Sequence, residues 1–137
     1  MKKKYFSNNT IRKVVGLALL IYLLLGWIFY VNQERFLFKP TLIATAAPLQ
    51  ISQAHQEISI PINQEDTIHI TRFTTKQPSK GAILYFHGNR QNVEWYAKYS
   101  SLFTNNGYEV FMLDYPGYGK SRGLLTEEKI YQWSDIV

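Results

Sequence analysis

The 137-residue sequence contains no cysteine, which excludes disulfides and thiolate metal sites. Its first 13 positions contain no acidic residue. They hold five basic residues, namely Lys2, Lys3, Lys4, Arg12 and Lys13. The whole chain has 15 basic and 10 acidic residues, so the ten basic residues after position 13 balance the ten acidic ones. The net charge of +5 therefore lies at the amino terminus, and no basic groove for nucleic acid is expected.

Residues 14–31, "VVGLALLIYLLLGWIFYV", form an apolar run without a charge. A helix of that length covers about 27 Å, close to the hydrocarbon thickness of a bilayer. Trp27 and Tyr30 lie near its far end, where aromatic rings prefer the membrane interface. Most of the nearby basic residues precede the run. The positive-inside tendency therefore predicts a single-pass anchor in the cell membrane, with residues 1–13 as a cytoplasmic tail and the rest on the outer or periplasmic side.

Two other interpretations of this run are a cleaved signal peptide and a buried helix of a soluble protein. The hydrophobic region of a signal peptide is usually shorter, and a small-x-small cleavage site follows it promptly. The nearest candidate site, Ala44-Thr45-Ala46, lies well beyond Val31. The sequence therefore favours an uncleaved anchor.

After the anchor, residues 32–57 read as a connector, and residues 58–137 read as a domain. Residues 58–62 and 67–75 alternate apolar and polar side chains, as half-buried strands do. The polar link at residues 63–66 suits a hairpin.

Strands and helices alternate after this hairpin. Residues 82–86 are a continuous apolar run, typical of a strand buried on both faces of a parallel sheet. A helix is predicted over residues 95–106, a second apolar strand over 110–113, and a final helix after Thr126, which suits an N-cap. The predicted apolar face of the first helix comprises Trp95, Tyr99, Leu102 and Phe103. The order β-β-β-α-β-α predicts an α/β fold with an antiparallel start and parallel crossovers.

Two loops resemble those of the α/β-hydrolase superfamily. "LYFHGNRQN", residues 84–92, resembles the third strand and H-G-N loop of that fold, and "VFMLDYPGYGKSRG", residues 110–123, resembles its fourth strand and the loop after it. The similarity is greatest to the membrane-anchored serine peptidase/esterase-like branch. The resemblance implies the N-terminal part of an α/β-hydrolase sheet preceded by one transmembrane helix. It also implies an acyl-enzyme mechanism on ester, thioester or amide bonds of a small-molecule or acyl substrate, without a cofactor.

Residues 119–123, "GKSRG", match the G-x-S-x-G pattern of a serine nucleophile. A nucleophile elbow places its serine on a sharp turn directly between a strand and a helix, whereas Ser121 is expected in the middle of a long loop. A phosphate-binding loop would need glycine where Asp114 stands. We therefore expect a structural loop. Asp114 would fix it, Gly117 and Gly119 would permit a tight, exposed turn, and Ser121 would hydrogen-bond locally.

The loop after the third strand supplies one backbone donor of the oxyanion hole in serine hydrolases of this fold. By resemblance this loop is His87, Gly88 and Asn89, with the Asn89 N–H as the donor, and Arg90 departs from the small residue usual at its position. The alternative is an ordinary strand-to-helix turn.

No catalytic residue is assigned in this chain, because the triad of the fold would follow the predicted final helix. His55 and His69 precede the nucleophile position and are expected at the surface, and no spacing of histidines and carboxylates indicates a metal site. The chain is therefore predicted to be the amino-terminal portion of a membrane-anchored serine hydrolase, inactive by itself and explained by a truncated or frameshifted reading frame. The alternative is a noncatalytic, membrane-tethered remnant or interaction module.

The predicted strand at residues 82–86 would lack a neighbour on one side. Such an apolar edge favours pairing with another chain. We therefore expect poor stability of this chain alone, or self-association through that strand.

Overall fold

The structure is a computed structural model and describes residues 8–137, which belong to two compact units divided after Phe36. The first unit consists of helix α1 (Asn8–Leu37), which has 30 residues, none of them buried. It is long and apolar enough to cross a membrane. The helix extends beyond the predicted residues 14–31 at both ends, because its polar flanks contain neither glycine nor proline to stop it.

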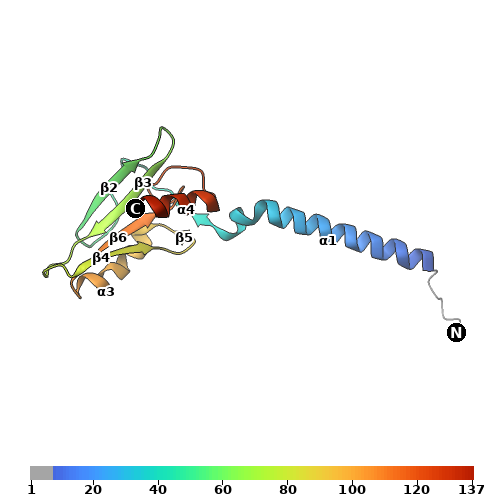
Figure 1. Cartoon of the computed structure of the whole chain (residues 1–137), viewed down its shortest axis with the longest axis horizontal. Coiled ribbons are helices and arrows are strands. Elements are labelled where there is room, and N and C mark those ends of the chain that lie inside the picture. Colours follow the sequence, from blue (N-terminus) through green and yellow to red (C-terminus); the bar gives the residue numbers. More distant parts are fainter. Residues whose placement is uncertain (1–7) are drawn as a thin grey trace. The chain divides into compact units, whose positions relative to one another are not determined.

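A four-stranded sheet forms the centre of the second unit (Figure 1). Its strands are β2 (His55–Pro61), β3 (Thr67–Phe73), β4 (Gly81–Phe86) and β6 (Tyr108–Asp114), in the spatial order β2-β3-β6-β4. β2 pairs with β3 and β3 with β6 in antiparallel directions, whereas β4 and β6 run parallel. The predicted antiparallel start and parallel crossover are confirmed.

Three short helical segments connect β4 to β6: α2 (Val93–Tyr96), the 3-10 turn η1 (Ala97–Tyr99) and α3 (Ser100–Thr104). Helical structure starts two residues before the predicted helix, because the Asn92 side chain accepts a hydrogen bond from the Glu94 N–H and caps α2. The fourth helix, α4 (Glu127–Ile136), follows Thr126, whose side chain accepts from the Lys129 N–H as an N-cap does.

Two hydrophobic clusters cover opposite faces of the sheet, because successive side chains of a strand point to opposite faces. The cluster beneath α2 and α3 contains Leu49, Phe73, Val93, Ala97, Val110 and Met112. The cluster beneath α4 contains Ile68, Ile70, Leu113 and Trp133.

The predicted apolar face of the β4–β6 connection is wrong in part. Trp95 is 45% exposed and Leu102 is 63% exposed, whereas Val93 and Ala97 are buried against the sheet. The break into short segments rotates the buried face away from the one that an uninterrupted helix would present.

β4 lies at the edge of the sheet and pairs only with β6. The expectation that residues 82–86 are buried on both faces is wrong, since Ala82, Leu84 and Phe86 are exposed. Ile83 and Tyr85 are half-buried on the other face, where Tyr85 packs against the cluster beneath α2 and α3.

The segment between α1 and β2 is tied to the domain. A short strand β1 (Lys39–Pro40) pairs in parallel with β5 (Arg90–Gln91), and Leu49 is buried in the cluster beneath α2 and α3. β2 begins at His55, ahead of the strand predicted at residues 58–62. The residues that follow α1 therefore take part in the fold rather than only linking two parts.

An ion pair joins α4 to the β2–β3 hairpin. The Lys129 ammonium lies 2.8 Å from Asp66 Oδ1, and Asn63 donates to the same carboxylate. The hydrogen bond from Lys129, together with that from Asn63, lowers the pKa of Asp66 below its ordinary value. A carboxyl group with a lowered pKa stabilises the fold above its ordinary pKa, and this contribution is lost as the pH falls through the folded-state pKa.

Asp66→Asn should therefore destabilise the chain at pH 7 but have progressively less effect in acid. We expect the difference in free energy of unfolding between wild type and D66N to shrink from about pH 5 to about pH 2, measured by urea unfolding in detergent. Glu65→Gln, at the exposed neighbour, is the matched control and should show no such convergence. If the difference in free energy of unfolding between wild type and D66N stays constant over this pH range, the ion pair does not have this stabilising role.

Candidate active-site loops

Two loops meet where β4 and β6 end, because parallel strands have their carboxyl ends at the same edge of a sheet. The first, here the HGN loop, comprises His87, Gly88 and Asn89. The second, here the β6 loop, comprises residues 115–123. Both the predicted oxyanion-hole residues and the predicted structural residues of the β6 loop lie at this edge.

The carbonyl groups of the HGN loop are held by other groups of the protein. The Tyr115 hydroxyl donates to the His87 carbonyl at 2.6 Å, and the Tyr118 hydroxyl donates to the Asn89 carbonyl at 2.7 Å. The Lys39 N–H also donates to the Asn89 carbonyl, at 2.8 Å. The Gly88 carbonyl lies 2.7 Å from Nδ1 of the His87 ring. Every carbonyl of the loop therefore has a partner.

These contacts also decide where the N–H groups of the loop point. The chain has no cis peptide bond, and in a trans peptide the N–H points opposite to the carbonyl of the preceding residue. The Gly88 and Asn89 N–H groups therefore point away from the partners of the His87 and Gly88 carbonyls. Both residues are exposed, and within residues 8–137 neither N–H donates a hydrogen bond. Backbone donors fixed in this way can bind a developing oxyanion.

The tyrosines that hold the loop stay protonated over a wide pH range. Burial raises the pKa of both Tyr115 and Tyr118 to about 12.

The ring of His87 stacks on Tyr96 with 5.0 Å between centroids. A Cβ atom on Gly88 would lie 2.6 Å from the Tyr96 hydroxyl oxygen, so a larger residue here would displace the Tyr96 side chain.

The Asp114 carboxylate lies behind both loops and is fully buried. Its Oδ1 accepts a hydrogen bond from the Val93 N–H at 2.9 Å and lies 3.3 Å from Nε2 of His87. Its Oδ2 lies 3.9 Å from Nδ1 of His69. Gly119 makes room for this carboxylate, because a Cβ there would lie 2.0 Å from Oδ2, and its φ of 47° also favours glycine. Asp114 thus connects α2, the HGN loop, β3 and the β6 loop.

His69 is buried, so the expectation of a surface position is wrong for this residue. Its Nε2 lies 2.9 Å from Oε2 of Glu57, which also accepts a hydrogen bond from the Lys120 ammonium at 2.6 Å. Burial raises the pKa of Glu57, but the hydrogen bonds from Lys120 and His69 outweigh it and leave the pKa below its ordinary value. His55 is half-buried, with Nδ1 2.8 Å from the Gln53 carbonyl oxygen.

Sequence reasoning missed Glu57 and Lys120 as members of this polar cluster. One signal was available in the hairpin register, in which His69 faces Ser59, so that Glu57 lies diagonally across from His69 on the same face. No group of three or more His, Asp or Glu side chains in the described part of the chain is arranged to hold a metal ion.

Ser121 is fully buried, and the expectation that its turn is exposed is wrong. Its hydroxyl donates to the Asp114 carbonyl at 2.6 Å and accepts from the His69 N–H at 2.9 Å. Gly117 and Gly119 have positive φ angles of 76° and 47°, as a tight turn requires. The Ser121 hydroxyl thus serves as a structural link between β3 and β6, with no ring nitrogen as its partner.

The residues directly after α1 are bonded to both loops. The Asn89 side chain donates to the Leu37 carbonyl, and the Asn92 side chain donates to the Thr41 carbonyl at 3.1 Å. The Thr41 carbonyl also accepts from the Gly119 N–H at 2.9 Å, and the Gly119 carbonyl accepts from the Ile43 N–H at 2.8 Å. Residues 37–43, here the exit segment, therefore hold the candidate site from one side.

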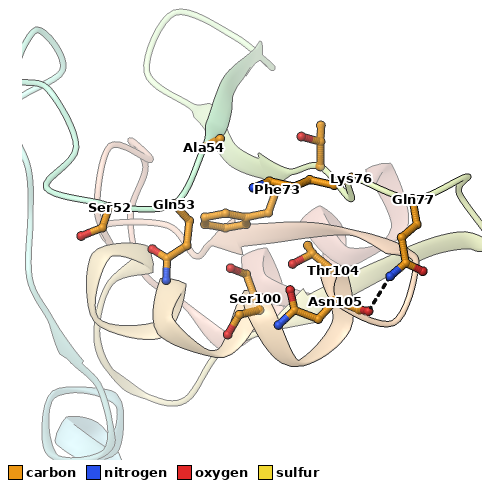
Figure 2. A pocket seen from close by; sticks show the side chains of 11 residues that line it. Ser52, Gln53, Ala54, Phe73, Lys76, Gln77, Ser100, Thr104 and Asn105 are labelled. Carbon is orange, nitrogen blue, oxygen red and sulfur yellow. Dashed lines mark hydrogen bonds between the residues drawn. The ribbon is translucent and has the colours of Figure 1, made fainter.

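A separate polar groove of about 580 Å³ lies at the opposite end of the sheet, where β3 ends (Figure 2). Serine, threonine and amide side chains line it around the buried Phe73 ring, and Gln77 donates to the Asn105 carbonyl across it. None of the HGN-loop or β6-loop residues belongs to its lining, so this groove is distinct from the candidate site.

The chain is similar to known proteins over part of its length. The sequence model of the serine aminopeptidase family (S33) matches residues 77–137, which include both loops. The resemblance to the α/β-hydrolases is thereby confirmed over this segment.

Several solved α/β-hydrolase structures are similar to the chain. An α/β-hydrolase from Vibrio vulnificus is 15% identical with a TM-score of 0.48, over 59% of this chain and 27% of that one. An esterase from Pyrococcus furiosus is 17% identical with a TM-score of 0.46, over 72% and 40%. A monoglyceride lipase from Saccharomyces cerevisiae is 13% identical with a TM-score of 0.47, over 66% and 32%. The chain thus spans between 27% and 40% of the length of these three structures.

Tyr115→Phe and Tyr118→Phe test how the HGN loop is held. We expect each variant to lose about 1–2 kcal/mol of stability, since a carbonyl of the HGN loop loses a hydrogen-bond donor. In an absorbance titration of the ten tyrosines, wild type should show a component ionising near pH 12, and each variant should reduce it. Because the folded-state pKa is raised, the stabilisation is complete below about pH 10 and is lost as the pH rises towards 12.

Tyr131→Phe, at an exposed position on α4, is the matched control and should leave both the stability and the late component unchanged. If no tyrosine of the wild type ionises near pH 12, then neither the Tyr115 nor the Tyr118 hydroxyl is buried as a hydrogen-bond donor.

Proposed function

We propose that this chain carries the oxyanion-hole loop and part of the sheet of a membrane-anchored serine hydrolase that acts on ester, thioester or amide bonds. The observation that carries the proposal is the HGN loop, in which the carbonyls are engaged and the Gly88 and Asn89 N–H groups are left exposed and without a partner within residues 8–137. The family match over residues 77–137 agrees with this chemistry.

In this proposal the Asn89 N–H is one of the two oxyanion donors, and the second belongs to the residue after the nucleophile. Ser121 is not that nucleophile. Its hydroxyl hydrogen is engaged by the Asp114 carbonyl, it is fully buried, and it makes no hydrogen bond with an imidazole ring. The nucleophile, its acid and its histidine are absent from the described residues, so the 137-residue chain is proposed to be inactive.

The proposed anchor is α1, and the proposed topology places the amino terminus in the cytoplasm and the sheet on the outer or periplasmic side. Support comes from the length and apolarity of α1 and from the five basic residues that precede residue 14.

A fluorophosphonate probe tests the assignment of Ser121. The 137-residue chain should not be labelled, and Ser121→Ala should give the same background as wild type, because a buried serine without a base is not a nucleophile. Modification of Ser121, located by peptide mass spectrometry, would overturn the proposal.

The second arm of this experiment uses the product of the DNA that continues past codon 137, in the same or a shifted frame. If that product contains a serine elbow, the probe should label it there. Asn89→Pro, which removes the backbone donor, should then slow labelling by roughly 10²–10³-fold. Asn89→Ala keeps the N–H and is the matched control. Equal rates for the two variants would exclude the oxyanion role of Asn89.

The runner-up proposal is a noncatalytic, membrane-tethered module that associates through β4. The observation that favours it is the free edge of this strand, with Leu84 39% and Phe86 43% exposed. Unpaired backbone groups on an apolar edge can add a strand from a second copy of the chain.

Leu84→Lys should abolish such association, because charge on an edge strand opposes strand addition. We expect concentration-dependent dimers of wild type and a monomer of L84K, measured by sedimentation velocity in detergent. Leu102→Lys introduces the same charge at an exposed leucine of α3, away from the edge, and should behave as wild type. A wild-type chain that stays monomeric at all concentrations would rule out this module.

A further inference from the structure

The polar groove of Figure 2 takes no part in the proposed chemistry and lies within the second unit of the chain. Three parts of that unit form its walls: the residues that precede β2, the end of β3 with the residues after it, and α3 with Asn105. Its volume of about 580 Å³ lies within the range of roughly 300–1,000 Å³ that is typical of small-molecule sites.

Hydrogen bonds hold one side of the groove in place. The Thr75 hydroxyl donates to the Thr104 carbonyl at 2.8 Å, and the Gln77 side chain donates to the Asn105 carbonyl at 3.1 Å. The Gln77 N–H also donates to the Thr75 hydroxyl, at 3.1 Å. The segment after β3 is thereby joined to the end of α3, and this side of the groove is formed before any ligand arrives.

One polar group in the lining has no partner in the protein. Ser100 is 1% exposed, and its hydroxyl makes no hydrogen bond within residues 8–137. Figure 2 shows Ser100 between Gln53 and Thr104, next to the buried Phe73 ring. A buried hydroxyl without a partner costs free energy, and a ligand atom that bonds to it recovers that cost. Ser100 therefore points to a polar ligand in the groove.

The side chains around Ser100 indicate the chemistry of this ligand. The lining contains one cation, Lys76, and no carboxylate, so it lacks the charges that a multiply charged anion or a cation would need. Most of its other polar groups are hydroxyls and amides, among them those of Ser52, Gln53, Thr74, Thr104 and Asn105. A hydroxyl both donates and accepts, and an amide has an NH₂ group and a carbonyl. Such groups match the hydroxyls of a sugar ring, which likewise donate and accept.

A peptide and an apolar ligand match the groove less well. A peptide that binds to a sheet adds a strand through a row of unpaired backbone groups at an edge. None of the lining residues belongs to β2 or β4, the two edge strands of the four-stranded sheet. An apolar ligand would leave the hydroxyls and amides without partners. A ligand rich in hydroxyl groups satisfies them.

We propose that the polar groove binds a neutral saccharide of one or two rings, with the Ser100 hydroxyl as the buried hydrogen-bond partner of a sugar hydroxyl. The proposal goes beyond the proposed hydrolase function and does not depend on it, because no residue of the HGN loop or the β6 loop lines the groove. The chain then holds a saccharide at the end of the sheet opposite the candidate oxyanion donors.

The test uses the full chain in phosphatidylcholine nanodiscs, because the head group of a sugar-based detergent would compete for the groove. Isothermal titration calorimetry measures the binding of maltose, lactose, cellobiose and chitobiose. We expect at least one of these neutral disaccharides to bind, and its addition to slow hydrogen exchange in peptides that cover residues 73–77 and 100–105. Absence of binding by all four, or protection confined to other segments, would overturn the proposal.

Ser100→Ala separates a ligand-binding role from a structural one. It should weaken disaccharide binding about five- to tenfold, the effect of one lost hydrogen bond. The midpoint of thermal unfolding of the free chain should stay the same or rise, because the variant removes a buried hydroxyl that has no partner there. Thr104→Val keeps the shape of the side chain and should also weaken binding.

Ser59→Ala is the matched control for S100A. It makes the same change at an exposed position of β2, outside the groove, and should bind the disaccharide as wild type does. Equal affinities of S100A and S59A would contradict the role of Ser100.

Trialanine in place of the disaccharide tests the peptide alternative. We expect no binding of trialanine to wild type. If trialanine binds, S100A weakens that binding and no disaccharide binds, the groove is a peptide site and the saccharide proposal is wrong.

Discussion

The buried Asp114 carboxylate is the constraint on which the arrangement of the second unit depends. A carboxylate removed from water is costly unless other groups satisfy it. Asp114 Oδ1 accepts a hydrogen bond from the Val93 N–H of α2, and Nε2 of His87 and Nδ1 of His69 face the carboxylate at 3.3 Å and 3.9 Å. Its Oδ2 has no hydrogen-bond partner among the described residues. The β6 loop can close over it only because Gly119 has no side chain. The contacts of this one buried side chain therefore lie where β3, the HGN loop and the start of α2 meet the end of β6.

Around this carboxylate, hydroxyl groups organise the backbone of the loops. Tyr115 and Tyr118 hold carbonyls of the HGN loop, and Ser121 connects the Asp114 carbonyl to β3. Each hydroxyl is a donor that remains protonated at neutral pH, and a carbonyl that accepts from it cannot rotate towards solvent. The N–H groups of the same peptides lie on the opposite side, and those of Gly88 and Asn89 have no acceptor within residues 8–137. The candidate oxyanion donors thus follow from how the other side of the loop is bonded.

The exit segment extends this arrangement to the end of α1. The Thr41 carbonyl accepts from the Gly119 N–H of the β6 loop and from the Asn92 side chain, and the Lys39 N–H shares the Asn89 carbonyl with Tyr118. A change in the exit segment therefore alters the same hydrogen bonds that orient the HGN loop.

Parts of the fold could be predicted because they depend on local forces. The alternation of apolar and polar side chains predicts the β2–β3 hairpin, and the capping side chain of Thr126 predicts the start of α4. Gly117 and Gly119 predict the turn of the β6 loop. The apolar face predicted for residues 95–106 is wrong in part, because helical spacing alone does not show whether an aromatic ring is buried. Trp95 instead lies on the surface, where the Lys98 ammonium sits 3.5 Å from its ring centroid. A cation–aromatic contact of this kind satisfies an exposed ring without burial.

The sequence by itself determined the apolar helix, the hairpin, the order of strands and helices along the chain and the two loops that carry the resemblance, since each depends on residues close together in the chain. Only the tertiary structure decided which polar residues are buried. The buried His69 ring contacts Glu57, which in turn accepts a hydrogen bond from Lys120, a residue 63 positions away in the chain. The buried Ser121 hydroxyl accepts a hydrogen bond from the His69 N–H of β3. The exposure of β4 and the pairing of Lys39 with Arg90 are likewise products of strand neighbours. Such contacts depend on which distant segments pack together, and no local pattern records that.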